Sequence, residues 1–285
     1  MIELLQERLA RYPVADSAQQ TQALKEILQE MVLYALWRND FFELAAFQGG
    51  TCLRILYGLP RFSEDLDFIL KSPDPGFRWS GILAGVTEVL QEFGVAAELV
   101  DRGRADRAVQ MAMLKDDSLG GQLELQFVDA VPGRKLRVKL EVDTHPPAGS
   151  GWDQRFHDFP TDFLVSVQDL PSNFALKLHA VLCRPYVKGR DWYDFLWYLR
   201  RSTVPNLVHL QHALQQSGPF AGKGVAVDAA WLRHALAERI SSLDWAEVVR
   251  DVEPFLNQTE RPSLGLWGPA LFTERTQSLY RLLLS

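Results

Sequence analysis

A short apolar run that ends in a glycine pair places the strongest constraint on how this chain can fold. Residues 44–47 are apolar and lead into Gly49-Gly50-Thr51, and residues 51–57 continue with helical spacing. This order predicts a short buried strand, a tight turn and a short helix. The same turn can bring backbone N–H groups close to a phosphate, because glycine places no side chain in the way.

The next expected strand carries two carboxylates on one face. Residues 66–70 are apolar except for Asp67, and Asp65 lies two positions before it. Strand side chains repeat every two residues, so both carboxylates point to the same side. Adjacent carboxylates repel each other unless a hard cation lies between them, and Mg²⁺ prefers a few carboxylates together with phosphate oxygens. A phosphate cradle followed by such a pair predicts nucleotide chemistry.

A third carboxylate is expected from a strand over residues 137–142, where polar and apolar residues alternate strictly. Two-metal phosphoryl or nucleotidyl transfer needs such a ligand to neutralise the attacking and leaving oxygens. We favour Glu141 for this role, with Asp143 on the same face as the alternative. A half-exposed strand with a solvated charged face explains the same pattern without any site.

A second group of charged residues lies near the middle of the chain. Lys177 and Arg184 are seven residues apart, so they share one face of a helix and suit a triphosphate or an RNA backbone. Beyond Pro185 a new helix opens at Arg190, with Asp191 and Asp194 on one face. The alternative is structural: the two arginines and two aspartates could form an ion-pair network that locks two helices together.

Composition limits the class of protein. The 285 residues are 47% hydrophobic and 23% charged, and their longest apolar runs are far short of a membrane span. The formal net charge of −6 argues against a protein that coats nucleic acid with its whole surface, yet it permits a local basic cleft. Charged residues near the start, among them Glu3 and Glu7, do not fit a signal peptide, so we expect a cytoplasmic protein.

Hydrophobic periodicity predicts an α+β fold in two domains. The first, residues 1–150, has N-terminal helices and a mixed sheet, and the second, residues 151–285, is mostly helical. Residues 145–160 are rich in Pro and Gly and are expected to be a loop at the boundary. The expected strands are 44–47, 66–70, 96–100, 108–114, 123–128, 137–142 and 163–167. The expected helices are 18–39, 51–57, 82–93, 170–183, 190–201, 207–215, 228–240, 245–252 and 270–284.

Taken in order, these motifs resemble the AbiEii/AbiGii toxin family of nucleotidyltransferases, which belongs to the DNA polymerase β-like superfamily. The resemblance covers roughly residues 47–199. Its motifs are Gly49-Gly50-Thr51-Cys52-Leu53-Arg54, Arg61-Phe62-Ser63-Glu64-Asp65-Leu66-Asp67-Phe68, Lys139-Leu140-Glu141-Val142, Ala175-Leu176-Lys177-Leu178-His179-Ala180 and Lys188-Gly189-Arg190-Asp191-Trp192-Tyr193-Asp194. Thr51 stands where the wider superfamily usually has Ser, and the third carboxylate position carries Glu rather than Asp.

The resemblance implies a nucleotidyltransferase-type sheet with flanking helices, followed by a helical domain. It implies transfer of a nucleoside monophosphate from an NTP to an RNA acceptor, with tRNA as the expected one. It also implies a cognate antitoxin protein as partner, and no membrane. The cofactor would be Mg²⁺, or Mn²⁺ in its place.

Residue roles follow from this resemblance. Asp65, Asp67 and Glu141 would hold the metals, while Gly49, Gly50 and Thr51 would orient the β- and γ-phosphates. Lys177 would offset charge on the triphosphate as pyrophosphate leaves. The remaining expected contacts to nucleotide or acceptor are Arg61, Ser63, Arg184, Arg190, Asp191 and Asp194.

Two other functions are compatible with the same residues. One is a nucleotide- or RNA-binding protein without transfer activity, because ligand residues alone do not establish turnover. The other is a phosphotransferase or NMP transferase that acts on a protein or a small molecule. The position of a radiolabel separates these: the α-phosphate stays on the product of nucleotidyl transfer, and the γ-phosphate on the product of a kinase.

Overall fold

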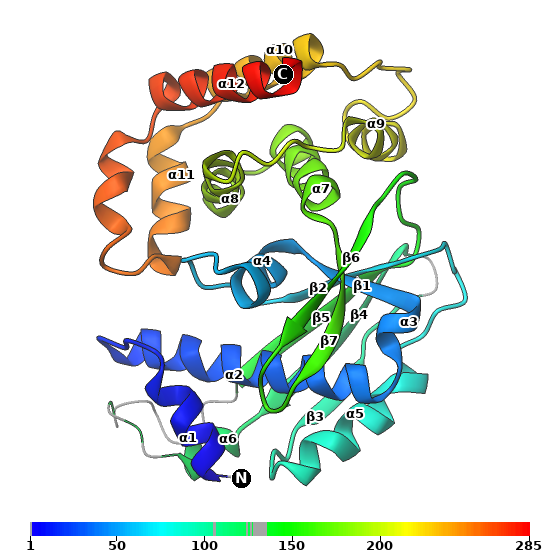
Figure 1. The fold of residues 1–285 in the computed structure, drawn as a ribbon, viewed down its shortest axis with the longest axis vertical. Helices are drawn as coiled ribbons and strands as arrows, with labels where there is room; N and C mark the ends of the chain where they lie inside the picture. The colour runs from blue at the N-terminus through cyan, green and yellow to red at the C-terminus, as the bar shows by residue number, and fades with distance from the viewer. Residues whose placement is uncertain (1, 105–106, 124, 126, 128–135) are drawn as a thin grey trace. The chain divides into compact units, whose positions relative to one another are not determined.

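The chain divides into two compact units, each with its own core. The computed structural model describes residues 2–104, 107–123, 125, 127 and 136–285 (Figure 1). The first unit comprises Met1–Gly58, Phe62–Pro146 and Asp153–Val167, and the second comprises Leu59–Arg61, Pro147–Trp152 and Gln168–Ser285. The domain boundary expected at residue 150 stays a prediction, and packing assigns residues 153–167, which lie beyond it, to the first unit.

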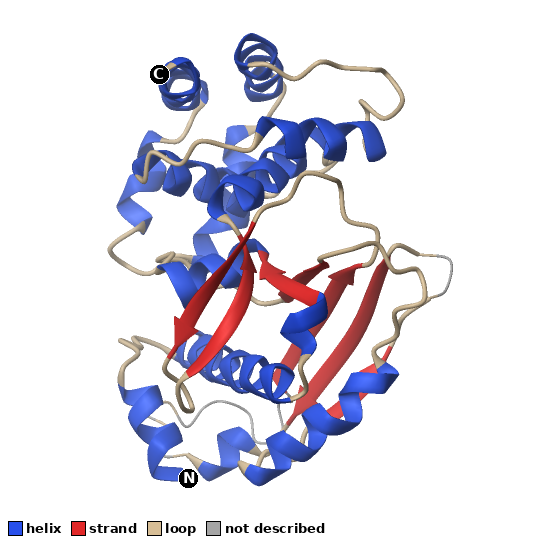
Figure 2. Cartoon of the chain, turned by 45° about the vertical axis from the view of Figure 1, so that its right-hand side comes forward, coloured by secondary structure: helices blue, strands red, loops and turns tan. Residues whose placement is uncertain are grey.

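One mixed sheet organises the first unit. In the described part of the chain seven strands pair in the order β3-β4-β5-β2-β1-β7-β6 (Figure 2). Their bounds are β1 Ala45–Gln48, β2 Leu66–Leu70, β3 Glu98–Asp101, β4 Val109–Asp116, β5 Leu136–Asp143, β6 Trp152–His157 and β7 Phe163–Gln168. β2 is antiparallel to β1 and parallel to β5, while β1 runs parallel to β7. The expected α+β class with a mixed sheet is confirmed.

Helices cover the sheet and bury its apolar side chains. Their bounds are α1 Ile2–Ala10, α2 Ser17–Arg38, α3 Phe41–Leu44, α4 Gly49–Tyr57, α5 Ser80–Glu92 and α6 Leu119–Gln122. α2 and α5 pack against each other, α2 against β5 and α5 against β3.

The longest of these helices, α2, is buried on nearly every side. Its two buried carboxylates are paired: Glu26 accepts from Arg54 at 2.9 Å, and Glu30 accepts from Arg8. Two buried carboxylates on one helix are tolerable only because each has a guanidinium partner. Among the described residues, no helix is both long and apolar enough to cross a membrane.

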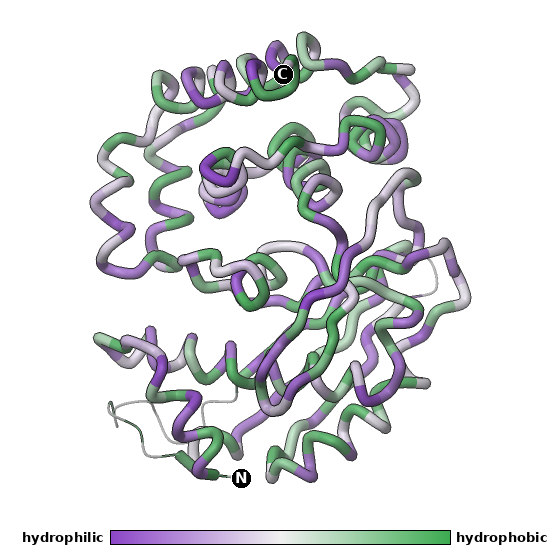
Figure 3. The backbone as a smooth tube through the Cα atoms, in the orientation of Figure 1, coloured by the Kyte–Doolittle hydropathy of each residue, from purple (hydrophilic) through white to green (hydrophobic). Residues whose placement is uncertain are grey.

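Helices alone form the larger part of the second unit. Their bounds are α7 Leu170–Cys183, α8 Gly189–Arg200, α9 Leu207–Gln216, α10 Ala229–Ser241, α11 Trp245–Val252 and α12 Pro269–Leu284, with short 3₁₀ segments η1 Glu253–Phe255 and η2 Arg261–Leu266. Hydrophobic and hydrophilic residues alternate along α12 (Figure 3). Its Phe272 is fully buried and stacks on Trp245, with the ring centroids 4.4 Å apart. Trp192 meets the same phenylalanine ring edge to face at 5.1 Å, so aromatic packing joins α8, α11 and α12.

Most expected elements are present; two differ, and one falls largely outside the described residues. The helix expected over residues 51–57 begins at Gly49, because the chain enters α4 directly from β1. The expected loop over residues 145–160 contains strand β6, whose residues 152–156 are all exposed, so no apolar alternation marks it. The expected strand over residues 123–128 falls largely outside the described residues.

Contact between α8 and α11 makes Gly189 intolerant of a side chain. A Cβ at this position would lie 2.0 Å from the carbonyl oxygen of Val248. Gly189→Ala is expected to lower the free energy of unfolding by about 1–3 kcal/mol, since backbone must move to relieve the clash. Urea unfolding followed by circular dichroism measures this change.

Gly265→Ala is the matched control, because a Cβ at Gly265 meets nothing within 4 Å. Equal stability of the two variants would contradict the packing described here.

Candidate active site

Three expected ligands meet on one face of the sheet because of its register. β2 and β5 are parallel neighbours in which Asp67 lies beside Glu141. Asp65 directly precedes β2 and alternates with Asp67, so its side chain points to the same face. Glu141 lies more than seventy positions after Asp65 and Asp67 in the sequence, yet all three carboxylates lie on one surface.

A lysine lies between two of these carboxylates. Lys139 Nζ is 3.0 Å from Glu141 Oε2 and 3.4 Å from Asp65 Oδ2. Partial burial acts to lower the pKa of Lys139, but the carboxylates of Asp65 and Glu141 outweigh it and raise that pKa. Positive charge is therefore favoured at this point of the carboxylate face.

Two buried side chains hold the loop that carries Asp65. Gln29 of α2 donates from Nε2 to the carbonyl oxygens of Ser63 at 3.3 Å and Glu64 at 2.7 Å. The Thr51 hydroxyl donates to the carbonyl oxygen of Asp65 and is hydrogen-bonded to the Ser63 hydroxyl at 2.9 Å. Thr51 is fully buried, so its hydroxyl orients the loop in this structure and does not face outward towards a phosphate.

Gly49 allows the turn into α4 and the close approach of Asp67. Its φ is +75°, a left-handed conformation that side chains other than glycine rarely adopt. A Cβ on Gly49 would lie 2.7 Å from Asp67 Oδ2, which is too close for any side chain. Gly50 follows in the first turn of α4, where the capping residue Gln48 makes no side-chain hydrogen bond to the helix. The N-terminus of a helix in general favours a negatively charged ligand.

The carboxylate oxygens of Asp65, Asp67 and Glu141 are the kind of ligand that a divalent cation binds. Carboxylate oxygens are what Mg²⁺ prefers, and the ammonium of Lys139 already places a positive charge between Asp65 and Glu141. Among the described residues, no three His, Cys, Asp or Glu side chains gather closely enough to enclose a metal ion. Asp65 and Asp67 therefore fit a cation that completes its coordination with oxygens from elsewhere, such as phosphate.

Register favours Glu141 over Asp143 as the third carboxylate. Asp143 lies beside Ile69, two positions further along β2 than Asp67. Its carboxylate accepts a hydrogen bond from the backbone N–H of His145 at 2.9 Å. Burial raises the pKa of Asp143, and the hydrogen bond from His145 only partly offsets this.

A separate network of buried charges lies in the helical unit. Arg61 donates to both carboxylate oxygens of Asp194, at 2.7 Å from Nε and 2.6 Å from Nη2. Lys177 Nζ is 2.8 Å from Asp194 Oδ2 and 2.8 Å from Asp191 Oδ1, and Arg184 Nε is 3.3 Å from Asp191 Oδ2. The structure thus brings five expected site residues together as an ion-pair network that links α7 to α8.

Electrostatics keeps this network charged. Burial acts to raise the pKa of Asp191 and Asp194, but nearby cations outweigh it and hold both pKa values below the usual range. Burial likewise acts to lower the pKa of Lys177, and the two aspartates raise it.

Two more cations stand at the start of α8. The Arg190 guanidinium lies 4.0 Å from the ring centroid of Phe255, a cation–π contact. Lys188 precedes the helix, and burial lowers its pKa to about 8 although Asp191 acts in the opposite direction. Neighbouring arginines contribute to this lowering, so the start of α8 has an excess of positive charge.

Comparison with known proteins assigns the family. The model of the nucleotidyl transferase AbiEii toxin family, of the Type IV toxin–antitoxin system, matches residues 32–267. The chain belongs to this family. The expected resemblance to AbiEii toxins is thereby confirmed, and the protein is assigned as a nucleotidyltransferase of a toxin–antitoxin class. No protein with curated annotation matches the sequence.

Solved structures share the fold of this AbiEii-family chain. JHP933 from Helicobacter pylori is similar over 93% of both chains, with a TM-score of 0.54 and 16% sequence identity. A candidate nucleotidyltransferase from H. pylori is similar over 93% of this chain and 96% of its own, with a TM-score of 0.53 and 15% identity. At these identities the similarity concerns the fold alone.

Two residues that shape the AbiEii-family carboxylate face were not expected from the sequence. Gln29 is one of several polar residues on α2, and only the burial of this helix in the fold distinguishes it, so the sequence gives no signal of its role. Lys139 belongs to one of the family motifs, yet its position between Asp65 and Glu141 follows only from strand register. Which expected site residues bind nucleotide stays a prediction.

Gly49→Ala tests the contact between the turn and Asp67. We expect a loss of about 1–3 kcal/mol in the free energy of unfolding, because a Cβ would displace Asp67 as well as strain the backbone. Chemical denaturation measures the loss.

Gly58→Ala is the control for strain alone, since Gly58 has a φ of +71° but open space around its Cβ position. If both variants lose the same stability, the close approach of Asp67 contributes nothing.

Asp194→Asn tests the buried network through pH. The pKa of Asp194 is lowered in the folded state, so its carboxylate contributes stability above the unfolded-state pKa of about 4 and loses that contribution as pH falls further. We expect Asp194→Asn to cost about 3–5 kcal/mol at neutral pH, because Arg61 and Lys177 lose a charged partner. Urea unfolding at pH values from 7 to below 4 should show the gap between variant and wild type narrowing in acid. A gap that is constant with pH would contradict the assignment.

Proposed function

We propose that this AbiEii-family protein transfers a nucleoside monophosphate from an NTP to an RNA acceptor with the help of Mg²⁺ or Mn²⁺, and that the acceptor is a tRNA. The observation that carries the proposal is the parallel register of β2 and β5, which aligns Asp67 with Glu141 while Asp65 shares their face. Asp65 and Asp67 on one rigid surface suit a divalent cation, and that cation when bound would neutralise the charged oxygens of a triphosphate.

Each part of this face has a proposed task. Asp65 and Asp67 would hold the cation, which when bound would neutralise charge on the attacking and leaving oxygens. The first turn of α4 would receive phosphate oxygens through its backbone N–H groups, with Gly49 giving the approach. Ser63 and Thr51 would act by fixing the loop before Asp65, which is the role that their hydrogen bonds support.

Lys177 and its neighbours belong to the helical unit, and their roles rest on the family pattern. We propose that Arg184 and Arg190 supply positive charge for the leaving pyrophosphate or the RNA backbone. Lys177 is ion-paired with Asp191 and Asp194, so it would offset charge on the triphosphate only by exchanging these partners. Arg61 would act by positioning, since its guanidinium is engaged with Asp194.

The biological setting is proposed from the family description. A Type IV toxin–antitoxin system implies an antitoxin protein as partner. NTPs and tRNA are intracellular, so a transferase of this kind would act in the cytoplasm.

Loss of either aspartate should abolish transfer. We expect Asp65→Ala or Asp67→Ala to lower transfer at least about a thousandfold, because removing a metal ligand removes transition-state charge stabilisation. The measurement incubates the protein with total RNA, Mg²⁺ and each α-³²P-labelled NTP in turn, and follows label in tRNA-sized bands.

Glu64→Gln is the matched control, because the Glu64 side chain is directed to Lys25, at 3.4 Å, and not to the carboxylate face. Full activity in either aspartate variant would refute the mechanism. Absence of transfer with every NTP, in a wild-type protein that binds Mg²⁺ and NTP, would favour the function of a nucleotide-binding protein without turnover. A parallel incubation with γ-³²P-labelled NTP is needed for the kinase alternative: label on the product from the γ-phosphate, with none from the α-phosphate, would identify a kinase.

A further inference from the structure

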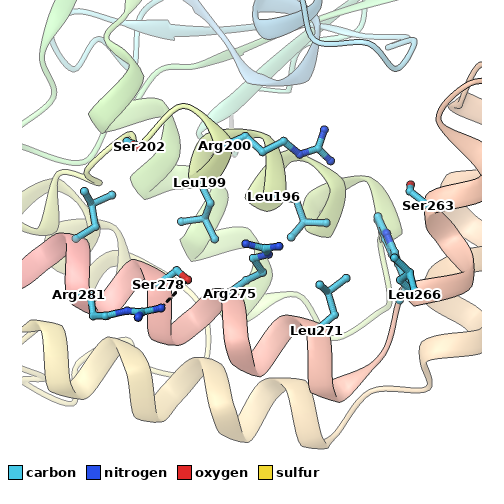
Figure 4. A pocket seen from close by; sticks show the side chains of 12 residues that line it. Leu196, Leu199, Arg200, Ser202, Ser263, Leu266, Leu271, Arg275, Ser278 and Arg281 are labelled. Carbon is cyan, nitrogen blue, oxygen red and sulfur yellow. Dashed lines mark hydrogen bonds between the residues drawn. The ribbon is translucent and has the colours of Figure 1, made fainter.

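The helical unit carries a groove that the proposed transfer reaction does not use. It has a volume of about 630 Å³ and lies between α8 and α12, with η2 at one end (Figure 4). Five leucines line it, namely Leu196 and Leu199 from α8, Leu266 from η2, and Leu271 and Leu282 from α12. On α12 the lining positions are three and four residues apart, so one continuous helix face forms that wall.

Arginines surround this leucine floor. Arg275 points from α12 towards Leu199, and Arg200 and Arg281 extend from the two walls (Figure 4). All three are exposed, and Arg275 pairs only with the adjacent, equally exposed Glu274 among the described residues. Within the same part of the chain, Arg200 and Arg281 have no carboxylate partner. Arg200 lies 5.9 Å from the ring centroid of Tyr193, and Arg281 donates to Ser278 at 3.3 Å.

Charge complementarity selects the kind of occupant. The whole chain has a net charge of −6. The three arginines give the groove a local positive charge, opposite in sign to the net charge of the chain. Guanidinium groups bind carboxylates and phosphates equally well, but the leucines need apolar side chains to cover them. RNA offers phosphates without aliphatic side chains, whereas an amphipathic helix offers both carboxylates and an apolar ridge.

We propose that the groove between α8 and α12 binds an amphipathic helix of a partner protein, with leucine-like side chains on the floor and Asp or Glu against Arg200, Arg275 and Arg281. A helix laid along two others is a common packing, since its side-chain ridge fills the channel between them. The binding is independent of Asp65 and Asp67, so it stands or falls separately from the transfer reaction.

A designed peptide tests the proposal on the full chain. The probe is a fluorescein-labelled helical peptide with leucines spaced three and four residues apart and glutamates on both sides of the leucine stripe. Fluorescence anisotropy should show saturable binding, and a peptide with lysines in place of the glutamates should bind at least about tenfold more weakly. Asp67→Ala should bind the probe as wild type does.

Variants of the groove give the decisive comparison. Arg275→Glu and Leu271→Gln should each weaken binding of the acidic peptide about tenfold, and Arg275→Glu should restore binding of the lysine peptide. Arg250→Glu, an exposed change of the same charge on α11 outside the groove, should have no effect. Circular dichroism of each variant confirms that it is folded.

Three results would overturn the proposal. The first is absence of saturable binding, or equal binding of the acidic and lysine peptides. The second is competition of the peptide by a single-stranded RNA whose binding is lost in Arg275→Glu but kept in Leu271→Gln. That result would identify the groove as an RNA contact. The third is a wild-type dimer in light scattering that Leu271→Gln dissociates, which would identify a contact between two copies of this chain.

Discussion

Hydrogen bonds to three consecutive backbone carbonyls hold the carboxylate face in place. Gln29 and Thr51 bind the carbonyl oxygens of residues 63–65, and neither side chain belongs to the face itself. A hydrogen bond of this kind contributes about 1 kcal/mol net, but leaving a buried carbonyl unpaired costs about 1–3 kcal/mol. The position of Asp65 therefore depends on the interior of the fold, where α2 and α4 supply the donors.

The two charged regions of the molecule use electrostatics differently. On the sheet, Lys139 and the three carboxylates are partly exposed, so their charges are screened and can be exchanged for those of a ligand. In the helical unit, Asp191 and Asp194 are almost fully buried and each meets two cations. Breaking such pairs is costly, so the second network also determines how α7 packs on α8.

The sequence was most informative where one element carries the whole signal. Helices α7 to α12 were predicted from their own apolar spacing, and in the structure Asp or Asn side chains cap four of them, α7, α9, α10 and α11. Asp65 and Asp67 share a face by strand geometry alone. The alignment of Asp67 with Glu141 needed strand register, which no local pattern contains.

Other features depend on contacts between distant segments. The burial of Thr51 reverses the outward orientation expected from its motif, because its hydroxyl meets a loop twelve or more residues later. The ion-pair network considered as an alternative is present for Arg184, Asp191 and Asp194, and it also includes Lys177 and Arg61. Arg61 could not be placed there from sequence, since it lies 133 positions before Asp194.

Strand order has a consequence for how the protein is made. β1 lies between β2 and β7, and its pairing with β7 joins Phe47 to Val167. Until residues 163–168 leave the ribosome, a nascent chain that has already formed β1, β2 and β5 has an open sheet edge beside the Gly49 turn. Translation that stops before β7 is made would therefore release a chain in which β1 has no partner on its outer side. That open edge of the sheet can pair with another chain.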